Sequence, residues 1–359
     1  MRLYLERCGT DLSNITIHER PGVYSAFDAS AVYGAADGIG VIGVAAAADS
    51  GETDEVVTVT SLAEGVAAFG ESGDMGALLE VLYANGAGVV KAVRVSAETE
   101  SGYEAAFKLL ETEEDIRVML CGSTQSAVQL KLKKSVEDAS NERRERIAVV
   151  ASDEQNVSDM KAHAALLNSE RMVLAAGRLR EGGSCLAAAA AIAAVIAKSG
   201  DPSLPVSGAE LYGVEDIIGR FNDAEIDLLV RGGVTAVENI GGETAAVRAV
   251  TTRTTTGGAA DATWRELTTV LIADNVICGL RNVLRSRFAR SKNTAQTRGA
   301  IRSQIIMELE GKLAQQIIDG YGDVRVKVAE NDPTVCEATF DFAVAHGLSR
   351  IYLTAHISV

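Results

Sequence analysis

Apolar residues come in short runs between residues 39 and 175, and the longer segments between these runs repeat apolar residues at helical spacing. Strands are predicted for the apolar, mostly β-branched runs, which are Ile39–Val44, Gly88–Val95, Ile116–Leu120, Ile147–Val150 and Met172–Ala175. Helices are predicted at Gly76–Ala84, Tyr103–Leu110, from Ser126 onward, at Val157–Leu167 and in the Ala-rich stretch after Ser184. Apolar strands that alternate with helices are typical of a mostly parallel sheet covered on both faces. The pattern therefore predicts an α/β fold.

The Thr- and Gly-rich segment Thr251–Gly258 interrupts this alternation, and a different pattern follows it. Two helices are predicted, at Asp261–Phe288 and Thr294–Ile318. Each has an apolar stripe at helical spacing, formed by Leu267, Val270, Ile277, Leu280 and Leu284 in the first and by Ile301, Ile305, Leu309, Leu313 and Ile317 in the second. Strands are predicted next, at Val324–Val328 and Val335–Val344. We therefore place a domain boundary near residue 255.

The last nine residues alternate strictly between apolar and polar side chains. The apolar positions are Ile351, Leu353, Ala355, Ile357 and Val359, and the polar ones are Tyr352, Thr354, His356 and Ser358. Such alternation predicts a strand with one apolar face. A strand at a chain end can pair within its own sheet, which is the commoner arrangement, or it can add to the sheet of a neighbouring molecule.

The first 24 residues have the character of an arm. They are mostly polar, and Pro21-Gly22 breaks any regular structure near their end. A segment with so little to build a core is either tied to another part of the assembly or disordered. Leu3-Tyr4-Leu5 is its candidate strand.

Composition narrows the class of protein. A length of 359 residues favours two domains, and 47% apolar residues are ample for real cores. The five cysteines are scattered without a CxxC pair, so we expect neither a disulfide framework nor a metal site. No signal peptide is predicted. No membrane-spanning helix is expected either, because the longest apolar candidate, Cys185–Ala197, is too short.

Charge is distributed unevenly along the chain. The net charge is −15, which argues against nucleic acid as a partner of the whole chain. Residues 1–275 carry 23 Lys and Arg against 41 Asp and Glu, whereas residues 276–359 carry 11 against 8. Seven basic residues and no acid lie between Asn275 and Ile305, namely Arg281, Arg285, Arg287, Arg290, Lys292, Arg298 and Arg302. A solvated helix face is the ordinary explanation, but so many unbalanced charges also suit an acidic partner surface.

The residues around a possible nucleotide-binding motif argue against a nucleotide site. Gly38–Gly43 matches GxGxxG, but a poor strand precedes it and Gly51 would cut off the helix that the motif requires. We interpret it as a strand punctuated by glycines, and the sequence has no Walker A motif.

Catalytic motifs are equally poor. Ser184 is better explained as a helix cap, and His163 lies in a helix among Ala and Leu. Asp153 and Glu154 are expected to begin a helix, where acids favour the positive end of the dipole. No catalytic, cofactor or metal residue is therefore predicted.

Several short stretches, in order, resemble the contractile tail sheath proteins of phages and phage-like particles. They begin with Pro21-Gly22-Val23-Tyr24 and Gly40–Ala45, and continue with Val59-Thr60-Ser61 leading into Phe69-Gly70. Asn85-Gly86-Ala87 then precedes Val93-Arg94-Val95. Arg298, Ile301, Asp332-Pro333 and the alternating terminus complete the resemblance, which covers nearly the whole chain.

This resemblance implies a structural protein rather than an enzyme, without cofactors. The implied fold is an outer α/β domain, subtilisin-like but without catalytic residues, at residues 25–255. An inner α+β domain would comprise residues 256–348 together with the arm at 1–24, and residues 349–359 would be a swapped-strand arm. Subunits would stack as hexameric rings around a tail tube and contract to drive the tube through the target envelope.

The resemblance also implies partners and surfaces. The strands exchanged between subunits would be Leu3–Leu5 and Ile351–Ile357, and Arg281, Arg285, Arg287, Arg290 and Lys292 would face an acidic tube. Partners would be other copies, the tube, the baseplate and the tail terminator, with no direct nucleic acid and no membrane insertion. Assembly would take place in the cytoplasm of a host bacterium, before release as part of a virion tail or phage-tail-like particle.

Three other readings remain from the sequence. The first is a soluble α/β enzyme or nucleotide-binding protein that uses the Gly38–Gly43 loop. The second is a nucleic-acid binder that uses the basic stretch, although stacking aromatics are scarce there. The third, a tail-tube protein, is disfavoured because tube subunits are usually smaller and all-β.

Overall fold

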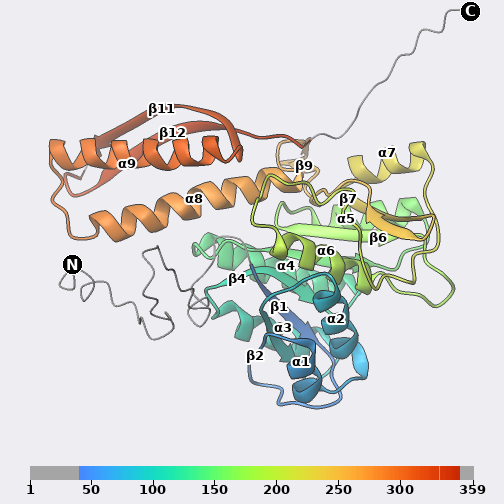
Figure 1. Cartoon of the computed structure of the whole chain (residues 1–359). Helices are drawn as coiled ribbons and strands as arrows, with labels where there is room; N and C mark the ends of the chain where they lie inside the picture. The colour runs from blue at the N-terminus through green and yellow to red at the C-terminus, as the bar shows by residue number, and fades with distance from the viewer. Residues whose placement is uncertain (1–39, 331, 348–359) are drawn as a thin grey trace, which may run out of the picture. The chain divides into compact units, whose positions relative to one another are not determined.

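A computed structural model describes residues 40–330 and 332–347 (Figure 1). The predicted terminal strands at Leu3–Leu5 and Ile351–Ile357 lie outside these residues, as do Gly38 and Ile39. The described residues combine a large layered α/β part with a C-terminal part of two helices and a hairpin.

An eight-stranded sheet is the centre of the α/β part. Its strands are β1 (Val41–Ala46), β2 (Val57–Val59), β3 (Val90–Arg94), β4 (Ile116–Cys121), β5 (Ile147–Ser152), β6 (Met172–Gly177), β7 (Val234–Ile240) and β8 (Glu243–Ala246). The order across the sheet is β2-β3-β1-β4-β5-β6-β7-β8. The six central strands are parallel, and β2 and β8 close the two edges in antiparallel orientation. The predicted α/β class with a mainly parallel sheet is therefore confirmed.

Helices cover both faces of this sheet. One face packs against α1 (Leu62–Phe69), α2 (Gly73–Ala84) and α6 (Leu186–Lys198). The other packs against α3 (Glu100–Glu111), α4 (Ser126–Asn141), α5 (Val157–Leu167) and α7 (Asp223–Arg231). Neighbouring strand residues point to opposite faces, so Val44 joins the first core and Ala45 the second. This double burial is why the central strands are apolar runs rather than alternating ones.

The Ala-rich helix α6 is buried along most of its length. Residues 188–194 have no exposed surface, because alanine side chains let the helix lie close to the strands. Cys185, not Ser184, occupies the N-cap position of α6. The Ser184 hydroxyl still accepts a hydrogen bond from the Leu186 amide at 3.3 Å. Ser184 therefore contributes to capping from the position before the N-cap.

The expectation that Asp153 and Glu154 begin a helix is wrong. Both lie in the loop between β5 and α5, and Asn156 is the N-cap of α5. Asp153 instead accepts the Cys185 amide at 2.7 Å, at the N-terminus of α6. The carboxylate therefore still meets the positive end of a helix dipole, but of a different helix.

The C-terminal part contains α8 (Leu267–Phe288), α9 (Ala295–Ala314), β11 (Ile318–Val328) and β12 (Cys336–Val344). Before it lies a small exposed hairpin of β9 (Thr255–Thr256) and β10 (Ala259–Ala260). Its turn residues Gly257 and Gly258 both have positive φ, which suits glycine in a tight hairpin. Strands β11 and β12 pair antiparallel and form a separate two-stranded sheet.

Helix α8 begins later than predicted and is more apolar than expected. Residues before Leu267 instead run beside the end of the sheet, where the Thr251 amide bonds the Arg265 carbonyl at 2.8 Å. By length and composition α8 could cross a membrane, so the expectation that no stretch qualifies is wrong. Five of its 22 residues are buried, and they contribute to two hydrophobic cores.

Candidate interaction surface

The sheet of β11 and β12 is covered on one face and bare on the other. Val324 and Val326 of β11 and Phe340 and Phe342 of β12 pack with α8 and α9 in a third core. On the opposite face charged residues alternate with them, and Lys327 pairs with Glu337 at 3.3 Å. No other described strand pairs with the outer edge of either β11 or β12. Open edges of this kind are the usual place where a further strand adds to a sheet.

Helix α8 links the C-terminal part to the large sheet. Leu267 and Val270 in its first turn belong to the core that includes α6. Ile272, Val276 and Leu280 belong to the core shared with α9 and the β11–β12 sheet. One helix is therefore packed in both parts of the molecule.

Two ion pairs add to this link. Arg281 binds both carboxylate oxygens of Glu145, at 2.6 and 3.0 Å, just before β5 begins. Asp274 pairs with Arg171, just before β6 begins. Both carboxylates are largely buried, so each needs its cation to remain charged.

The pKa values of these two carboxyl groups are shifted in opposite directions. Burial alone would raise the pKa of Glu145, but hydrogen bonds from Arg281 and the Cys278 thiol, with the charge of Arg281, hold this pKa at about 2. Burial outweighs the charge of Arg171 at Asp274 and raises its pKa. Glu145 is thus the more firmly charged of the two.

These contacts separate one of the five predicted basic residues from the other four. Arg285, Arg290 and Lys292 are exposed, and their side chains have no hydrogen-bond or ion-pair partner among the described residues. Arg287 donates to the Gln304 side chain at 2.6 Å, whereas Arg281 is held by Glu145. The structure thus places four of the five at the exposed end of α8 and in the following loop, and the fifth at the link between the two parts.

No signal in the sequence identifies the partner of Arg281. Glu145 is 136 residues away along the chain and precedes an ordinary strand. Asp274 and Arg171 are likewise distant in sequence, so only the tertiary fold brings these residues together.

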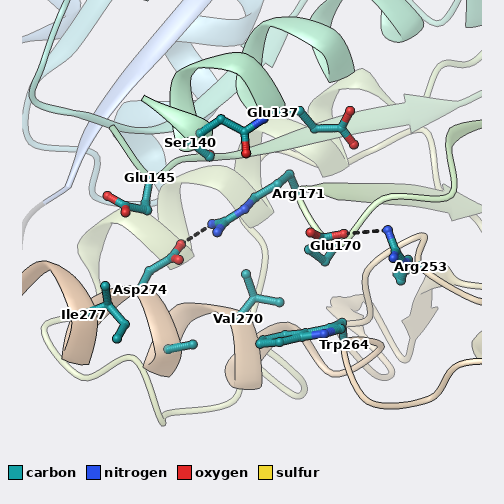
Figure 2. Close-up of a pocket in the computed structure, with 12 residues that line it drawn as sticks. Glu137, Ser140, Glu145, Glu170, Arg171, Arg253, Trp264, Val270, Asp274 and Ile277 are labelled. Carbon is teal, nitrogen blue, oxygen red and sulfur yellow. Dashed lines mark hydrogen bonds and ion pairs between the residues drawn. The ribbon is translucent and has the colours of Figure 1, made fainter. Parts of the chain in front are cut away.

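A cavity of about 450 Å³ opens between α4 and α8 (Figure 2). It is lined by the C-terminal end of α4, the residues before β5 and β6, Arg253, Trp264 and the first half of α8. Trp264 is the single tryptophan of the chain, and sequence reasoning did not select it.

Residues considered for catalysis make structural contacts. The His163 ring bonds the Gln129 side chain at 2.9 Å, and burial lowers the pKa of this histidine. The Ser184 hydroxyl donates to Asp153 and lies in no contact with a histidine among the described residues. Within the same residues, no group of three or more His, Cys, Asp or Glu is placed to hold a metal ion.

The described glycines of the motif, Gly40 and Gly43, are closely packed against side chains. Gly43 lies inside β1, and a side chain there would begin 2.6 Å from the Met119 sulfur. The glycine serves close packing within the sheet, as expected for a strand punctuated by glycines, and does not form a loop around a phosphate.

Three family models match consecutive parts of the chain. The N-terminal region of domain III of tail sheath protein Gp18 matches residues 40–95. The phage tail sheath protein central domain matches residues 97–252, and the phage tail sheath C-terminal domain matches residues 259–358.

A curated relative and solved structures agree with these matches. The tail sheath protein of Bacillus phage SP01 is 27% identical over 134 residues, which are 37% of this chain and only 23% of that protein. The sheath tail protein of Desulfitobacterium hafniense is 11% identical with a TM-score of 0.67, over 90% of this chain and 100% of that one. The anti-feeding prophage helical sheath in its contracted state is 14% identical with a TM-score of 0.70, over 95% of this chain and 99% of that one. At these identities the structural likeness shows a shared fold.

Proposed function

Because the chain belongs to the phage tail sheath family, we propose that it is the structural subunit of a contractile sheath. Subunits stack as hexameric rings around a tail tube, and contraction drives the tube through the envelope of a target cell. The observation that carries this proposal is the two-stranded sheet of β11 and β12, whose outer edges pair with no other strand among the described residues. The family models match residues 40–95, 97–252 and 259–358.

Strand addition between subunits would complete this sheet. The segment Ile351–Ile357 has an apolar face that could extend the β11–β12 layer over α8 and α9, with its polar face outward. Leu3–Leu5 is the candidate strand from the N-terminal arm. Backbone hydrogen bonds give such an addition its affinity, and the alternating side chains set its register.

Two domains follow from the same proposal. The outer domain, residues 25–255, is built on the eight-stranded sheet and is subtilisin-like in fold without catalytic residues. The inner domain, residues 256–348, is completed by residues 1–24 and by the arm at 349–359 of neighbouring copies. The contacts of Ser184 and His163 support a structural role for both, and we propose no enzymatic activity and no cofactor.

The exposed end of α8 supports a tube-facing role for part of the basic surface. Arg285, Arg290 and Lys292 have no side-chain partner in residues 40–330 and 332–347, so they could meet an acidic tube, with Arg287 near them in the sequence. Exposed ion pairs contribute only about 0–1 kcal/mol each, so a few such contacts per subunit would hold the tube and still release it. Arg281 can join them only by leaving Glu145.

The remaining partners and the place of assembly complete the proposal. The baseplate and the tail terminator would bind the ends of the sheath. Assembly would take place in the cytoplasm of a host bacterium, and the sheath would then be part of a virion tail or a phage-tail-like particle.

Deletion of residues 351–359 tests the proposal. The truncated chain is expected to keep its far-ultraviolet circular dichroism and to form no sheath by negative-stain electron microscopy, alone or with its tube. Replacement of the same residues by an unrelated alternating apolar and polar strand is the matched control and should restore part of the assembly. Normal striated cylinders from the truncated chain would contradict the exchange of this strand.

The tube contact is tested separately. Changing Arg285, Arg290 and Lys292 together to Glu should weaken co-assembly with the tube and leave sheath self-assembly intact. Arg325→Glu, on the bare face of the β11–β12 sheet, is the control. Equal tube binding by the triple variant and the wild type would remove these residues from the interface.

A further inference from the structure

The chain leaves the β11–β12 sheet beside the large α/β part. Val344 is the last residue of β12, and the Ala345 amide still bonds the Ile317 carbonyl at 3.3 Å. Two residues later, Gly347 lies against the ring of Pro205, which belongs to the loop between α6 and α7. This short stretch is therefore held on one side by the C-terminal part and on the other by the α/β part.

The contact between Gly347 and Pro205 leaves no room for a side chain. A Cβ added to Gly347 would overlap the Cγ of Pro205, and it would lie 3.3 Å from the Cδ and 3.4 Å from the Cβ of the same ring. A carbon–carbon single bond is only about 1.5 Å long, so the Gly347 backbone itself is in van der Waals contact with the proline. The pyrrolidine ring is rigid and cannot turn away as a long side chain would. Any larger residue at position 347 must therefore move the chain off the ring.

The loop that carries Pro205 is fixed to the α/β part. The next residue, Val206, is buried in the core that includes α6. The Ser207 hydroxyl then accepts the Ala249 amide at 3.1 Å. Buried side chains and paired backbone groups are characteristic of segments that open rarely. Gly347 thus rests on a firm surface of the α/β part.

This contact lies close to the predicted terminal strand. Ile351 follows Gly347 by four residues and Ala345 by six. An extended chain spans about 3.5 Å per residue, so a strand anchored at Gly347 begins within about 14 Å of the anchor. A chain held only at Ala345 would reach about 21 Å, and the volume open to the start of the strand would be about threefold larger. A shorter free length raises the effective concentration of a tethered segment at a site that it can reach.

We propose that Gly347 and Pro205 anchor the base of the C-terminal arm and so determine which neighbouring copy the arm reaches. This inference rests on the proposed function, in which residues 349–359 add to the sheet of a neighbour. An anchored arm leaves the subunit in one direction, so its strand meets the open β11–β12 edge of one neighbour more often than that of any other. Gly347 and Pro205 are positioning residues, because they act on the neighbour only through the arm.

Distances to a label on the arm test the anchor in the unassembled chain. Unnatural amino acids carry one spin label at Arg350 and a second at Leu228, which is 49% exposed on α7. In pulsed electron double resonance the otherwise wild-type chain should give one narrow distance distribution, and Gly347→Ala should give a broad one. Pro205→Ala combined with Gly347→Ala removes the overlapping Cγ and should make the distribution narrow again. Equally broad distributions for the wild type and Gly347→Ala would overturn the proposal.

Assembly tests the consequence for the sheath. Gly347→Ala should raise the critical concentration for sheath assembly about threefold, in proportion to the larger volume open to the strand. The double variant with Pro205→Ala should return this concentration toward that of the wild type. Gly320→Ala in β11 is the matched control, because a Cβ added there has no neighbour within 4 Å. Urea unfolding of the unassembled variants verifies that each remains folded.

The outcomes separate the anchor from the proposed function. Assembly of Gly347→Ala like that of the wild type would overturn the inference while leaving the proposed function standing. An equal loss in Gly320→Ala, or no recovery in the double variant, would do the same, since neither depends on the overlap with the proline ring. A wild-type chain that forms no sheath with its own tube would instead overturn the proposed function, and the inference with it.

Discussion

The large sheet and the β11–β12 sheet bury their residues to very different extents. All six residues of β5 and all six of β6 are buried. None of the nine residues of β12 is fully buried, and in β11 only Ile318 and Val324 are. A sheet with helices on both faces is complete within one chain, whereas the β11–β12 sheet packs on helices over one face only and has fewer buried residues to stabilise it. This difference is what we expect if the α/β part folds on its own and if, as proposed above, neighbouring subunits complete the C-terminal part.

Truncation of one large apolar side chain in each of the two cores should give the largest difference in the free energy of unfolding. Leu120→Ala in β4 removes a fully buried side chain and should lower the free energy of unfolding by about 2–5 kcal/mol. Phe342→Ala in β12 removes a partly buried side chain and should cost the unassembled chain about 1–2 kcal/mol by the same reasoning. Urea unfolding of the unassembled variants measures both. A larger loss for Phe342→Ala would break the comparison, because it would make the C-terminal sheet an independent core.

A second test compares a buried arginine of the α/β part, Arg146, with an exposed arginine of the C-terminal part, Arg285. The Arg146 side chain is 1% exposed and donates to the carbonyls of Leu110 and Glu113, at the end of α3, at 3.0 and 2.6 Å. Arg146→Met should leave the Glu113 carbonyl unpaired, whereas the Leu110 carbonyl keeps its bond from the Glu113 amide at 3.3 Å. The free energy of unfolding should therefore fall by about 1–3 kcal/mol. Arg285→Met, at an exposed position without a described partner, should change it by less than about 0.5 kcal/mol. Equal effects in urea unfolding would mean that water replaces the lost donor at α3.

The same contrast explains what the sequence could predict. Five of the six parallel strands stood out because burial on both faces makes them continuous apolar runs, whereas β7, which contains Thr235, Glu238 and Asn239, was not predicted. Helix Val157–Leu167 was predicted with its observed bounds. Edge strand β8 and helix α7 were not predicted, since only Leu229 and Val230 of α7 are fully buried and its pattern is weak. Strand β11 was predicted only from Val324 onward, because Gly320, Gly322 and Asp323 interrupt its apolar pattern.

That interruption has a structural cause. The pairing of β11 with β12 shifts register twice in this stretch, and Asp323 has a φ of 50°. Bulges accommodate residues that a regular strand would exclude. The candidate surface was predictable as a basic stretch, but the pairing of Arg281 with Glu145 was not, since it depends on the approach of α8 to the start of β5.

Acid should weaken the link between the two parts through Glu145. The pKa of this carboxyl is lowered to about 2 in the folded chain from an ordinary 4.5. A lowered pKa stabilises the fold above pH 4.5, and that contribution is lost as pH falls toward 2. Relative to Glu145→Gln, the wild type should therefore lose about 1–3 kcal/mol between pH 5 and pH 2.

The comparison with Glu145→Gln isolates this group. The charge of Glu145 contributes to the raised pKa of Asp274, so both proteins should also carry Asp274→Asn to keep this second carboxyl out of the difference. Urea unfolding at several pH values gives the two curves. Parallel curves for the two proteins would show that the Arg281 pair contributes nothing to the link.

The smallest effect is expected on the bare face of the β11–β12 sheet. Lys327 and Glu337 pair at 3.3 Å across the two strands, but their side chains are 62% and 46% exposed. An exposed pair gains little over water, so Glu337→Gln should change the free energy of unfolding by less than about 0.5 kcal/mol. Added salt should reduce even that difference, because salt screens exposed charges. A loss above about 1 kcal/mol in low-salt urea unfolding would mean that this face is shielded within one chain, and the β11–β12 sheet would then need no neighbour to complete it.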